Sequence, residues 1–274
     1  MIEEACSQDI LWFVFYKDEL ILQHQEDGSF SIPHGKTPPV TPPSLNTTHR
    51  ISPMSDGTEV RTFSLSNPLQ ESDSNPLCGD WELCGLRESF YKLPIELFQK
   101  AGKCKEILYW DEKNKYCGVC GSPLTLDTDI SKRCHSCGNE VWAQVSTAII
   151  VRINRGDELL LVKARNFRKN FYGLVAGFVE TGESLEEAVC REVMEETGIH
   201  IKNLRYFDSQ PWPFPCGLMV GFTAEYANGE LHLQLSELDQ GGWFHYKNLP
   251  TLPDSVSIAR RLINDFLESK KDCQ

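Results

Sequence analysis

Residues 177–199 read GFVETGESLEEAVCREVMEETGI and contain the clearest helix of the sequence. Ser184 and Glu187 have the spacing of a capping box, which predicts that the helix begins near Leu185. Gly198, directly after Thr197, is a typical residue for ending a helix. At about 100° per residue, one narrow stripe of this helix carries four side chains that should face the core: Leu185, Val189, Glu192 and Glu196.

Two glutamates on the stripe that faces the core are unusual. A solvated helix face would explain Glu186 and Glu187, but it explains Glu192 and Glu196 poorly. Like charges that are buried together cost several kcal/mol unless a cation compensates them. Mg²⁺ is a natural compensator, because it binds carboxylates, water and phosphates. Glu195 lies at the edge of the same stripe, so the helix predicts a carboxylate site for a divalent cation.

A compact cysteine module precedes this helix, with the knuckles CGVC (117–120) and CHSC (134–137). Each knuckle presents two thiolates from one tight turn, which Gly121 and Gly138 permit. Two such knuckles close a tetrahedral four-sulfur site, which predicts structural zinc. The alternative is a pair of redox dithiols, which would more commonly use one CxxC motif than two. The predicted zinc ligands are Cys117, Cys120, Cys134 and Cys137.

The composition indicates a soluble protein of the cytoplasm. The formal net charge is −12, so long-range attraction to nucleic acid or anionic membranes is excluded, and local basic groups or metal ions must draw in any polyanionic ligand. No apolar run approaches the roughly 18 residues that span a bilayer. Four of the 11 cysteines have metal spacing and the others are scattered, which is typical of a reducing compartment. The acidic N-terminus lacks the pattern of a signal peptide.

Strands and helices alternate without βαβ regularity, so the predicted fold class is α+β. Residues 10–32 predict a short antiparallel sheet, and residues 33–58, rich in Pro, Ser and Thr, predict a loop. The remaining expected elements are a helix over 94–114, a hairpin over 147–164, a strand over 172–180, a second hairpin over 218–234 with an Asn-Gly turn, a strand over 241–246 and a helix over 257–269.

The stretch 177–199 resembles the Nudix box, GX5EX7REUXEEXGU with U aliphatic. The match holds at Gly177, Glu183, Arg191, Glu192, Val193, Glu195, Glu196, Gly198 and Ile199. Nudix hydrolases cleave nucleoside diphosphates linked to another group, with Mg²⁺ or Mn²⁺ held by this helix. The resemblance implies an α/β/α Nudix sandwich over 142–274. It also implies catalytic roles for Glu183, Arg191, Glu192, Glu195 and Glu196.

The segment SQPWPFPCG (209–217) is similar to the SQPWPFPxS signature of the NAD(H) pyrophosphatase subfamily. That subfamily also carries a four-cysteine zinc ribbon and a less regular N-terminal domain. The resemblance therefore covers essentially the whole chain. It implies an NADH-pyrophosphatase-like domain of mixed α/β structure over 1–112, the zinc ribbon over 113–141 and the Nudix domain over 142–274.

The resemblance implies further site residues by position. Ala176, through its backbone carbonyl, and Glu237 would join Glu192 and Glu196 in holding Mg²⁺ or Mn²⁺. The implied substrate contacts are Arg87, Asp129, Trp142, Gln210, Pro211, Trp212, Pro213, Phe214, Pro215, Cys216, Gly217 and Ala259. Two of these depart from the subfamily: Gly217 stands where Ser is usual, and Trp142 where Tyr is common. The ring of Phe214 is expected to stack on a base or a nicotinamide; the alternative is that it plugs the core.

The implied activity is hydrolysis of NAD(H) to NMN(H) and AMP, with the metals neutralising the pyrophosphate and lowering the pKa of an attacking water. Within the enzyme class, the alternative is removal of NAD caps from RNA 5′ ends by the same site. From another class, a Nudix fold that has lost catalysis would serve as a ligand sensor or regulator, which the intact box argues against. The subfamily also suggests a homodimer.

Overall fold

The computed structural model describes residues 9–43, 48–67, 81–165 and 170–271. Of the scattered cysteines, Cys6, Cys78 and Cys273 lie outside these ranges, and the eight cysteines within them form no disulfide with one another. The chain divides into two compact units, one of residues 1–144 with Pro213–Cys216 and the other of residues 145–212 with 217–274. No helix in the described ranges is both long and apolar enough to cross a bilayer.

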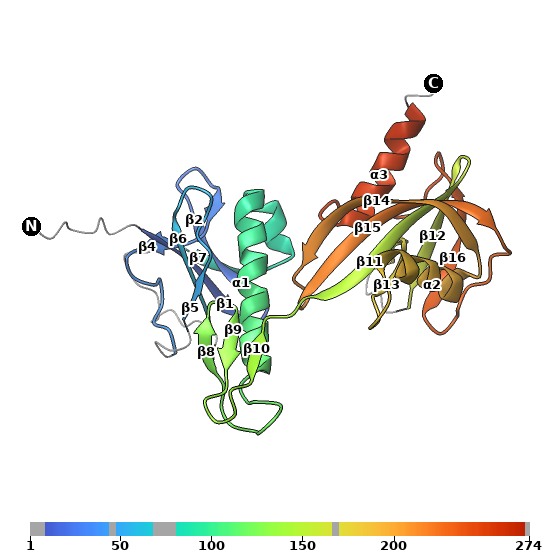
Figure 1. Cartoon of the computed structure of the whole chain (residues 1–274). Coiled ribbons are helices and arrows are strands. Elements are labelled where there is room, and N and C mark those ends of the chain that lie inside the picture. The colour runs from blue at the N-terminus through green and yellow to red at the C-terminus, as the bar shows by residue number, and fades with distance from the viewer. Residues whose placement is uncertain (1–8, 44–47, 68–80, 166–169, 272–274) are drawn as a thin grey trace, which may run out of the picture. The chain divides into compact units, whose positions relative to one another are not determined.

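The first unit is built on a mixed sheet beside one long helix (Figure 1). The sheet runs in the order β3-β2-β1-β6-β5, with β4 on β1 and β7 on β2. Its elements are β1 Ile10–Tyr16, β2 Glu19–His24, β3 Phe30–Ser31, β4 His34–Gly35, β5 His49–Ile51, β6 Glu59–Ser64, β7 Trp81–Gly85, the 3-10 helix Glu88–Tyr91 and α1 Ile95–Lys113. The predicted antiparallel pairing of β1 with β2 is confirmed, but β1 also pairs with β6 in parallel.

The zinc ribbon is a three-stranded antiparallel sheet within this unit, formed by β8 Thr125–Thr128, β9 Ser131–Arg133 and β10 Glu140–Trp142. Lys132 of β9 is buried and attaches the ribbon to the end of α1. Its Nζ lies 2.8 Å from the Asp111 carboxylate and donates to the carbonyls of Asp111 and Asn114. On the other side of Asp111, buried His49 of β5 lies 3.5 Å away. These contacts join the ribbon, α1 and the first sheet.

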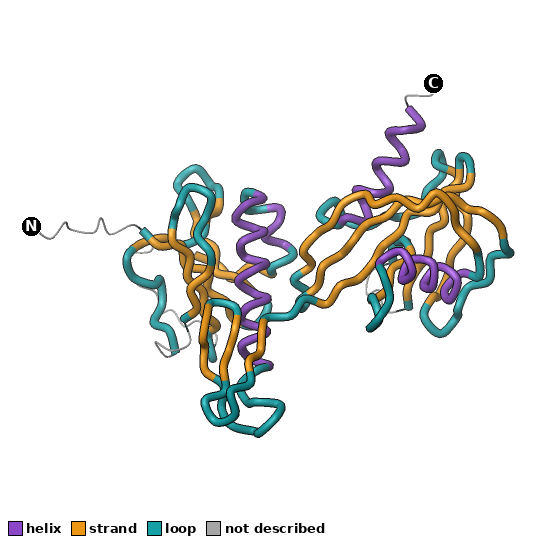
Figure 2. The backbone as a smooth tube through the Cα atoms, in the orientation of Figure 1, coloured by secondary structure: helices purple, strands orange, loops and turns teal. Residues whose placement is uncertain are grey.

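The second unit is a sheet between two helices (Figure 2). The strand order is β14-β15-β11-β12-β16, with β13 paired to β11. Ile149 and Val151 of β11 pack in the cluster that includes α2, whereas Ile150 between them packs with α3. The alternation of a strand thus gives each helix its own face, and the α/β/α layering is confirmed. The elements are β11 Ser146–Arg155, β12 Glu158–Ala164, β13 Val175–Phe178, α2 Leu185–Thr197, β14 His200–Trp212, β15 Gly217–Asn228, β16 Leu238–His245 and α3 Ile258–Lys271.

Two local predictions differ from the structure. The first hairpin is confirmed as β11 and β12, but the second is wrong, because residues 229–237 form no strand and β15 pairs with β14 and β11 instead. Tertiary pairing with β11 overrides the Asn-Gly turn signal. Residues 33–58, expected to be a loop, contain β4 and β5, whose two or three residues are too short to show periodicity.

Candidate active site

Helix α2 begins and ends at the residues that its sequence predicts. The Ser184 hydroxyl accepts from the backbone N–H of Glu187 at 3.2 Å, and the Glu187 carboxylate accepts from the N–H of Ser184 at 2.7 Å. Gly198 closes the helix in the left-handed conformation with φ 69°. The helix is therefore fixed at both ends by local chemistry, which sets the rotation of its glutamates toward the sheet.

Arg191 organises the carboxylates on one side of the helix. Its guanidinium donates to both oxygens of Glu183, at 3.0 and 2.6 Å, and to Glu192 and Glu195 at 3.0 and 3.1 Å. It also donates to the backbone carbonyl of Phe178 at 2.9 Å. The hydrogen bonds from Arg191 hold the pKa of Glu183 below its ordinary value. Arg191 thus ties α2 to β13 and fixes the orientation of Glu192.

Glu196 faces the core as predicted, since it is only 5% exposed. Its Oε2 is buried and has no hydrogen-bond partner among the described residues. Burial raises the pKa of Glu196 to about 8, and the neighbouring charges of Glu192, Glu237 and Glu195 add to the effect. The pKa of Glu192 is also raised, mainly by burial, although Arg191 opposes the shift. The helix therefore presents carboxylates whose charge the protein itself leaves partly uncompensated.

The neighbouring strand comes very close to these carboxylates. A Cβ atom at Gly177 would overlap the carboxylate of Glu192, so any larger residue at that point of β13 would have to displace the Glu192 side chain. Ala176 precedes it in the same strand, and Glu237 lies just before β16. A buried carboxylate oxygen without a partner, beside further carboxylates, fits a hard divalent cation such as Mg²⁺ or Mn²⁺.

The four cysteines of the ribbon form a separate cluster. Their sulfur atoms all lie within 4.8 Å of one another, with Cys117 and Cys137 3.6 Å apart and Cys120 and Cys134 3.4 Å apart. A tetrahedral zinc with bonds of about 2.3 Å needs sulfurs about 3.8 Å apart, which lies between the two short separations and the 4.8 Å limit of the cluster, so the four sulfurs fit zinc after a small adjustment. Four protein ligands leave no open position, as expected of a structural site.

The segment 209–217 divides into a strand and a turn. Its first four residues end β14, an edge strand in which exposed Pro211 is tolerated, and Trp212 there is half-buried. The turn Pro213–Cys216 groups with the first unit, and buried Pro213 packs against Gly102 of α1. Within the turn, Pro215 is exposed and Cys216 half-buried.

Phe214 is 39% exposed, and the guanidinium of Arg87 lies 5.4 Å from the centre of its ring. The alternative that Phe214 plugs the core is therefore wrong. Arg87 and Phe214, which are both predicted substrate contacts, therefore form a cation–π pair. Gly217, beyond the turn, is crowded, because a Cβ there would lie 3.1 Å from the carbonyl oxygen of Trp212.

Gln210 and Ala259 meet in the second unit. The Gln210 amide donates to the carbonyl of Val256 at 2.7 Å and accepts from the N–H of Ile258 at 2.6 Å. Both of its polar atoms are thereby occupied at the start of α3. Ala259 is the next residue of that helix and is buried. In this structure Gln210 positions the start of α3.

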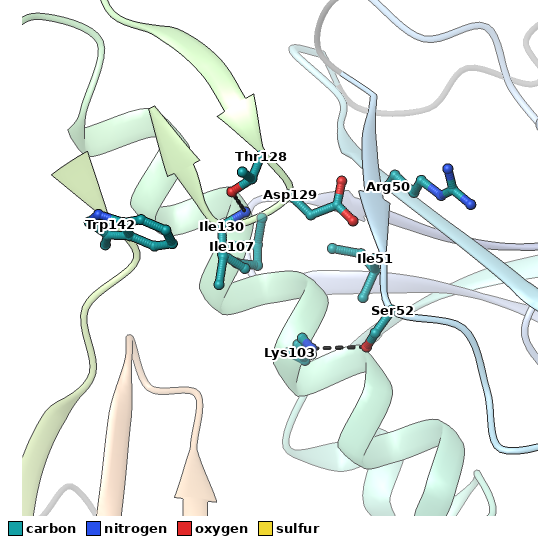
Figure 3. A pocket seen from close by; sticks show the side chains of 9 residues that line it. All are labelled: Arg50, Ile51, Ser52, Lys103, Ile107, Thr128, Asp129, Ile130 and Trp142. Carbon is teal, nitrogen blue, oxygen red and sulfur yellow. Dashed lines mark hydrogen bonds between the residues drawn. The ribbon is translucent and has the colours of Figure 1, made fainter. Parts of the chain in front are cut away.

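Asp129 and Trp142 line one cavity of about 430 Å³ in the first unit (Figure 3). The cavity lies between the ribbon, α1 and β5, and Trp142 is 52% exposed. Arg50 and Lys103 also line this cavity. The sequence analysis did not predict this, because a single basic residue without a motif indicates no site. Phe178, to which the sequence analysis gave no role, directly follows Gly177 in β13 and is 65% exposed. The sequence does show this aromatic residue, because Phe178 lies inside the stretch 177–199.

Three family models match the chain: an NADH pyrophosphatase-like rudimentary NUDIX domain over residues 10–110, an NADH pyrophosphatase zinc ribbon domain over 112–141 and a NUDIX domain over 143–266. The chain is also similar to a crystal structure of a NUDIX hydrolase from Nitrosomonas europaea, with a TM-score of 0.51 and 20% identity over 58% of this chain and 94% of that one. This likeness concerns the fold.

Curated relatives are similar over a larger part of the chain. The NAD-capped RNA hydrolase NudC of Stutzerimonas stutzeri is 40% identical over 77% of this chain and 75% of its own length. The protein of the same name from Chromobacterium violaceum is 40% identical over 72% and 74%. That of Pectobacterium carotovorum is 46% identical over 62% of this chain, which spans 66% of that relative. The chain therefore belongs to the Nudix family, in the group that carries the NADH pyrophosphatase zinc ribbon.

Proposed function

We propose that the protein hydrolyses the pyrophosphate of NAD(H), giving NMN(H) and AMP. The observation that carries the proposal is the buried Glu196, whose unpartnered oxygen lies in the field of Glu192 and Glu237. Such a cluster is costly unless a divalent cation occupies it, and a cation held there would meet the phosphates of a dinucleotide. The similarity to curated NAD-capped RNA hydrolases directs the choice of substrate toward NAD compounds.

Mg²⁺ or Mn²⁺, when bound, would neutralise the pyrophosphate and lower the pKa of a water. Glu192, Glu196 and Glu237, with the Ala176 carbonyl, would hold it. Arg191 keeps Glu192 and Glu195 oriented through its hydrogen bonds, with Glu183 as its anchor. Glu195, at the exposed edge of the cluster, or Glu196 would take the proton of the attacking water. Placement and charge stabilisation are the main tasks in reactions of this kind.

Aromatic rings of the substrate would be held by exposed side chains. Phe214 with Arg87 offers one stacking surface, and Phe178 in β13 offers another. The resemblance to the subfamily supports Asp129 and Trp142 as further substrate contacts. The segment Gln210–Gly217 and Ala259 would complete the binding residues. Because the Gln210 amide is occupied by backbone atoms, its role would be to hold Ala259 in place.

A second candidate is removal of NAD caps from RNA, which the names of the relatives favour. The same glutamates would cleave the same pyrophosphate, so the two substrates differ only in the RNA chain that is attached to the adenosine. A sensor without catalysis is disfavoured, because it would have no use for a carboxylate that the fold buries without a partner.

The domains proposed from the sequence span residues 1–112, 113–141 and 142–274, and the matched family ranges support these boundaries. Structural zinc in the ribbon is part of the proposal. The resemblance to the subfamily supports a homodimer. The absence of disulfides among the described cysteines supports a reducing compartment, the cytoplasm.

Product analysis by chromatography tests the proposed function. The protein is incubated with NADH, NAD, ADP-ribose or NAD-capped RNA, in Mg²⁺ or Mn²⁺. We expect NMNH and AMP from NADH, and an RNA with a 5′ monophosphate from the capped substrate. Release of nicotinamide, or no turnover of NADH and NAD with either metal, would contradict the proposal.

A further inference from the structure

Glu237 ends a turn that begins at Gln234 and lies mostly outside the hydrophobic core of the second unit. Leu238 after this Glu237 turn is buried in the cluster that includes α2, and Leu233 before it packs against that cluster. Leu235 within the turn is 65% exposed. The N–H groups of Glu237 and Leu238 both donate to the Gln234 carbonyl, at 3.0 and 2.9 Å. Hydrophobic packing therefore fixes the two ends of the turn but leaves the position of Glu237 to polar contacts.

The start of the Glu237 turn is attached to the end of α2. The backbone N–H of Gln234 donates to the carbonyl of Glu196 at 2.9 Å, and that of His232 donates to the carbonyl of Thr197 at 2.9 Å. Both carbonyls belong to the last turn of the helix, where the helix itself supplies no donor. The chain that leads to Glu237 is thus bonded to the residue that carries the buried carboxylate.

Arg165 attaches the other side of the Glu237 turn to β12. The ladder between β12 and β16 ends with Ala164 opposite Leu238, after a β-bulge. The backbone N–H of Arg165 then donates to the carbonyl of Glu237 at 2.8 Å, and its guanidinium donates to the carbonyl of Leu235 at 2.6 Å. A charged donor makes a stronger hydrogen bond than a neutral one. One residue therefore holds the backbone at Glu237 and two positions before it.

We propose that Arg165 is a positioning residue of the metal site: its guanidinium holds the turn through the Leu235 carbonyl, so that the Glu237 carboxylate stays beside the other ligands. This inference rests on the proposed function, in which Glu237 is a metal ligand. The charge of Glu237 raises the pKa of both Glu192 and Glu196, so its carboxylate lies in their field in this arrangement. Because Arg165 is exposed, its loss should loosen the turn without unfolding the domain.

Position and charge predict opposite effects of removing the guanidinium of Arg165. A guanidinium near a bound cation repels it, so an effect of charge alone would make metal binding tighter in a variant without this group. If Arg165 positions Glu237, the same variant binds metal more weakly, because loss of a group that orients a metal ligand costs about 10–100-fold in affinity. The direction of the change in metal affinity therefore distinguishes the two roles.

Titration of the full chain with Mn²⁺ alone, followed by electron paramagnetic resonance, tests the inference. We expect Arg165→Met to weaken Mn²⁺ binding about tenfold, toward the affinity of Glu237→Gln. Arg165→Lys should restore part of the loss, because an ammonium can still donate to the Leu235 carbonyl. In a Glu237→Gln background, Arg165→Met should change the affinity by less than about twofold, since the ligand that Arg165 positions is already lost.

Lys163→Met is the matched control. Lys163 lies two residues earlier in β12, and its ammonium is 3.1 Å from the carboxylate of Asp239, beyond the Glu237 turn. The control removes the same charge from the same strand but keeps the contacts of Arg165. The Mn²⁺ affinity of Lys163→Met should therefore differ from that of the parent by less than about twofold.

Unchanged or tighter Mn²⁺ binding in Arg165→Met, or an equal loss in Lys163→Met, would overturn the inference. It would also be overturned by an equal loss from Arg165→Met in the parent and in Glu237→Gln, or by a parent that shows no saturable Mn²⁺ binding.

Hydrolysis of NADH by the parent is assayed separately at saturating Mn²⁺. A parent that hydrolyses NADH, but whose Mn²⁺ affinity does not depend on Arg165, rejects this inference alone. A parent that does not hydrolyse NADH, but whose Mn²⁺ affinity falls in Arg165→Met as expected, rejects the proposed function alone.

Discussion

The ribbon cysteines and the α2 carboxylates are two proposed ligand sets for metal that differ in how they are built. The four cysteines come from two turns within residues 117–137, and their sulfurs are already gathered within 4.8 Å. The carboxylates come from α2 and from Glu237 before β16, and one buried oxygen of Glu196 remains without a partner among the described residues. Four cysteine ligands on short turns form a closed site with a structural role. Carboxylates that repel one another on one helix leave negative charge uncompensated, and a metal ion that arrives with the substrate can neutralise this charge.

A third carboxylate shows that burial alone does not make a catalytic group. Glu106 of α1 also has a buried oxygen without a hydrogen-bond partner among the described residues, and burial raises its pKa to about 7. No other carboxylate contributes to that shift; the nearby charge is Lys103, which opposes it. Glu196, by contrast, lies in the field of three other glutamates. The cluster, more than the burial, marks the candidate active site.

The largest difference between the carboxylate cluster and the ribbon cysteines is expected in the activity of the Glu196→Gln variant. The change keeps the shape but removes a charge that would bind metal, so kcat for NADH should fall about a thousandfold or more. The melting temperature without divalent metal should hold or rise, because repulsion inside the cluster is relieved. Steady-state kinetics and thermal melting measure the two effects.

Glu186→Gln is the matched control for that variant, because Glu186 lies on the exposed face of the same helix. It should change kcat by less than about twofold. Equal activity of the Glu186 and Glu196 variants would refute the assignment of the catalytic face.

The ribbon should respond in the opposite way. Cys134→Ser removes one ligand from a buried position, so zinc should fall well below one atom per chain and the free energy of unfolding by about 4–5 kcal/mol, as for loss of a structural metal. Metal analysis and urea denaturation measure both. Cys190→Ser, at an exposed free thiol of α2, is the control and should leave both values unchanged. A Cys134 variant as stable as the parent would remove the distinction between the two sites.

A smaller, pH-dependent effect is expected from Glu106→Gln. Because the pKa of Glu106 is raised to about 7 in the folded protein, folding keeps a proton that the unfolded chain loses near pH 4.3. The stability of the parent should therefore fall as pH rises from about 4 to 7, and level off above that. Glutamine avoids this loss, so the variant should be more stable by roughly 2–3 kcal/mol at pH 8 and nearly equal to the parent at pH 4.

Urea denaturation at the two pH values measures this difference. Glu112→Gln, at an exposed position of the same helix, serves as the control and should show no such dependence on pH. A stability gain in Glu106→Gln that is as large at pH 4 as at pH 8 would show that packing, and not ionisation, is responsible.

Local signals decided much of the fold in advance. Helix α2 begins at its capping box and ends at Gly198 because both signals act within one turn of the chain. The two CxxC knuckles likewise bring their sulfurs together through short turns. The prediction of the second hairpin was wrong for the opposite reason. Strand β15 pairs with β11 and β14 and not with residues 230–234, and the partner strand β11 lies far away in the sequence.

The sequence by itself determined the chemistry that depends on short spacing, namely the four thiolates of the ribbon and the helix stripe that carries Glu192 and Glu196. Only the tertiary structure decided which side chains meet across long separations. It buried one oxygen of Glu196 without a partner, placed Arg87 on the ring of Phe214, occupied Gln210 at the start of α3, and gathered Arg50, Lys103, Asp129 and Trp142 around one cavity. Burial and electric fields depend on distances in space, and a linear pattern specifies those distances only within a few turns of chain.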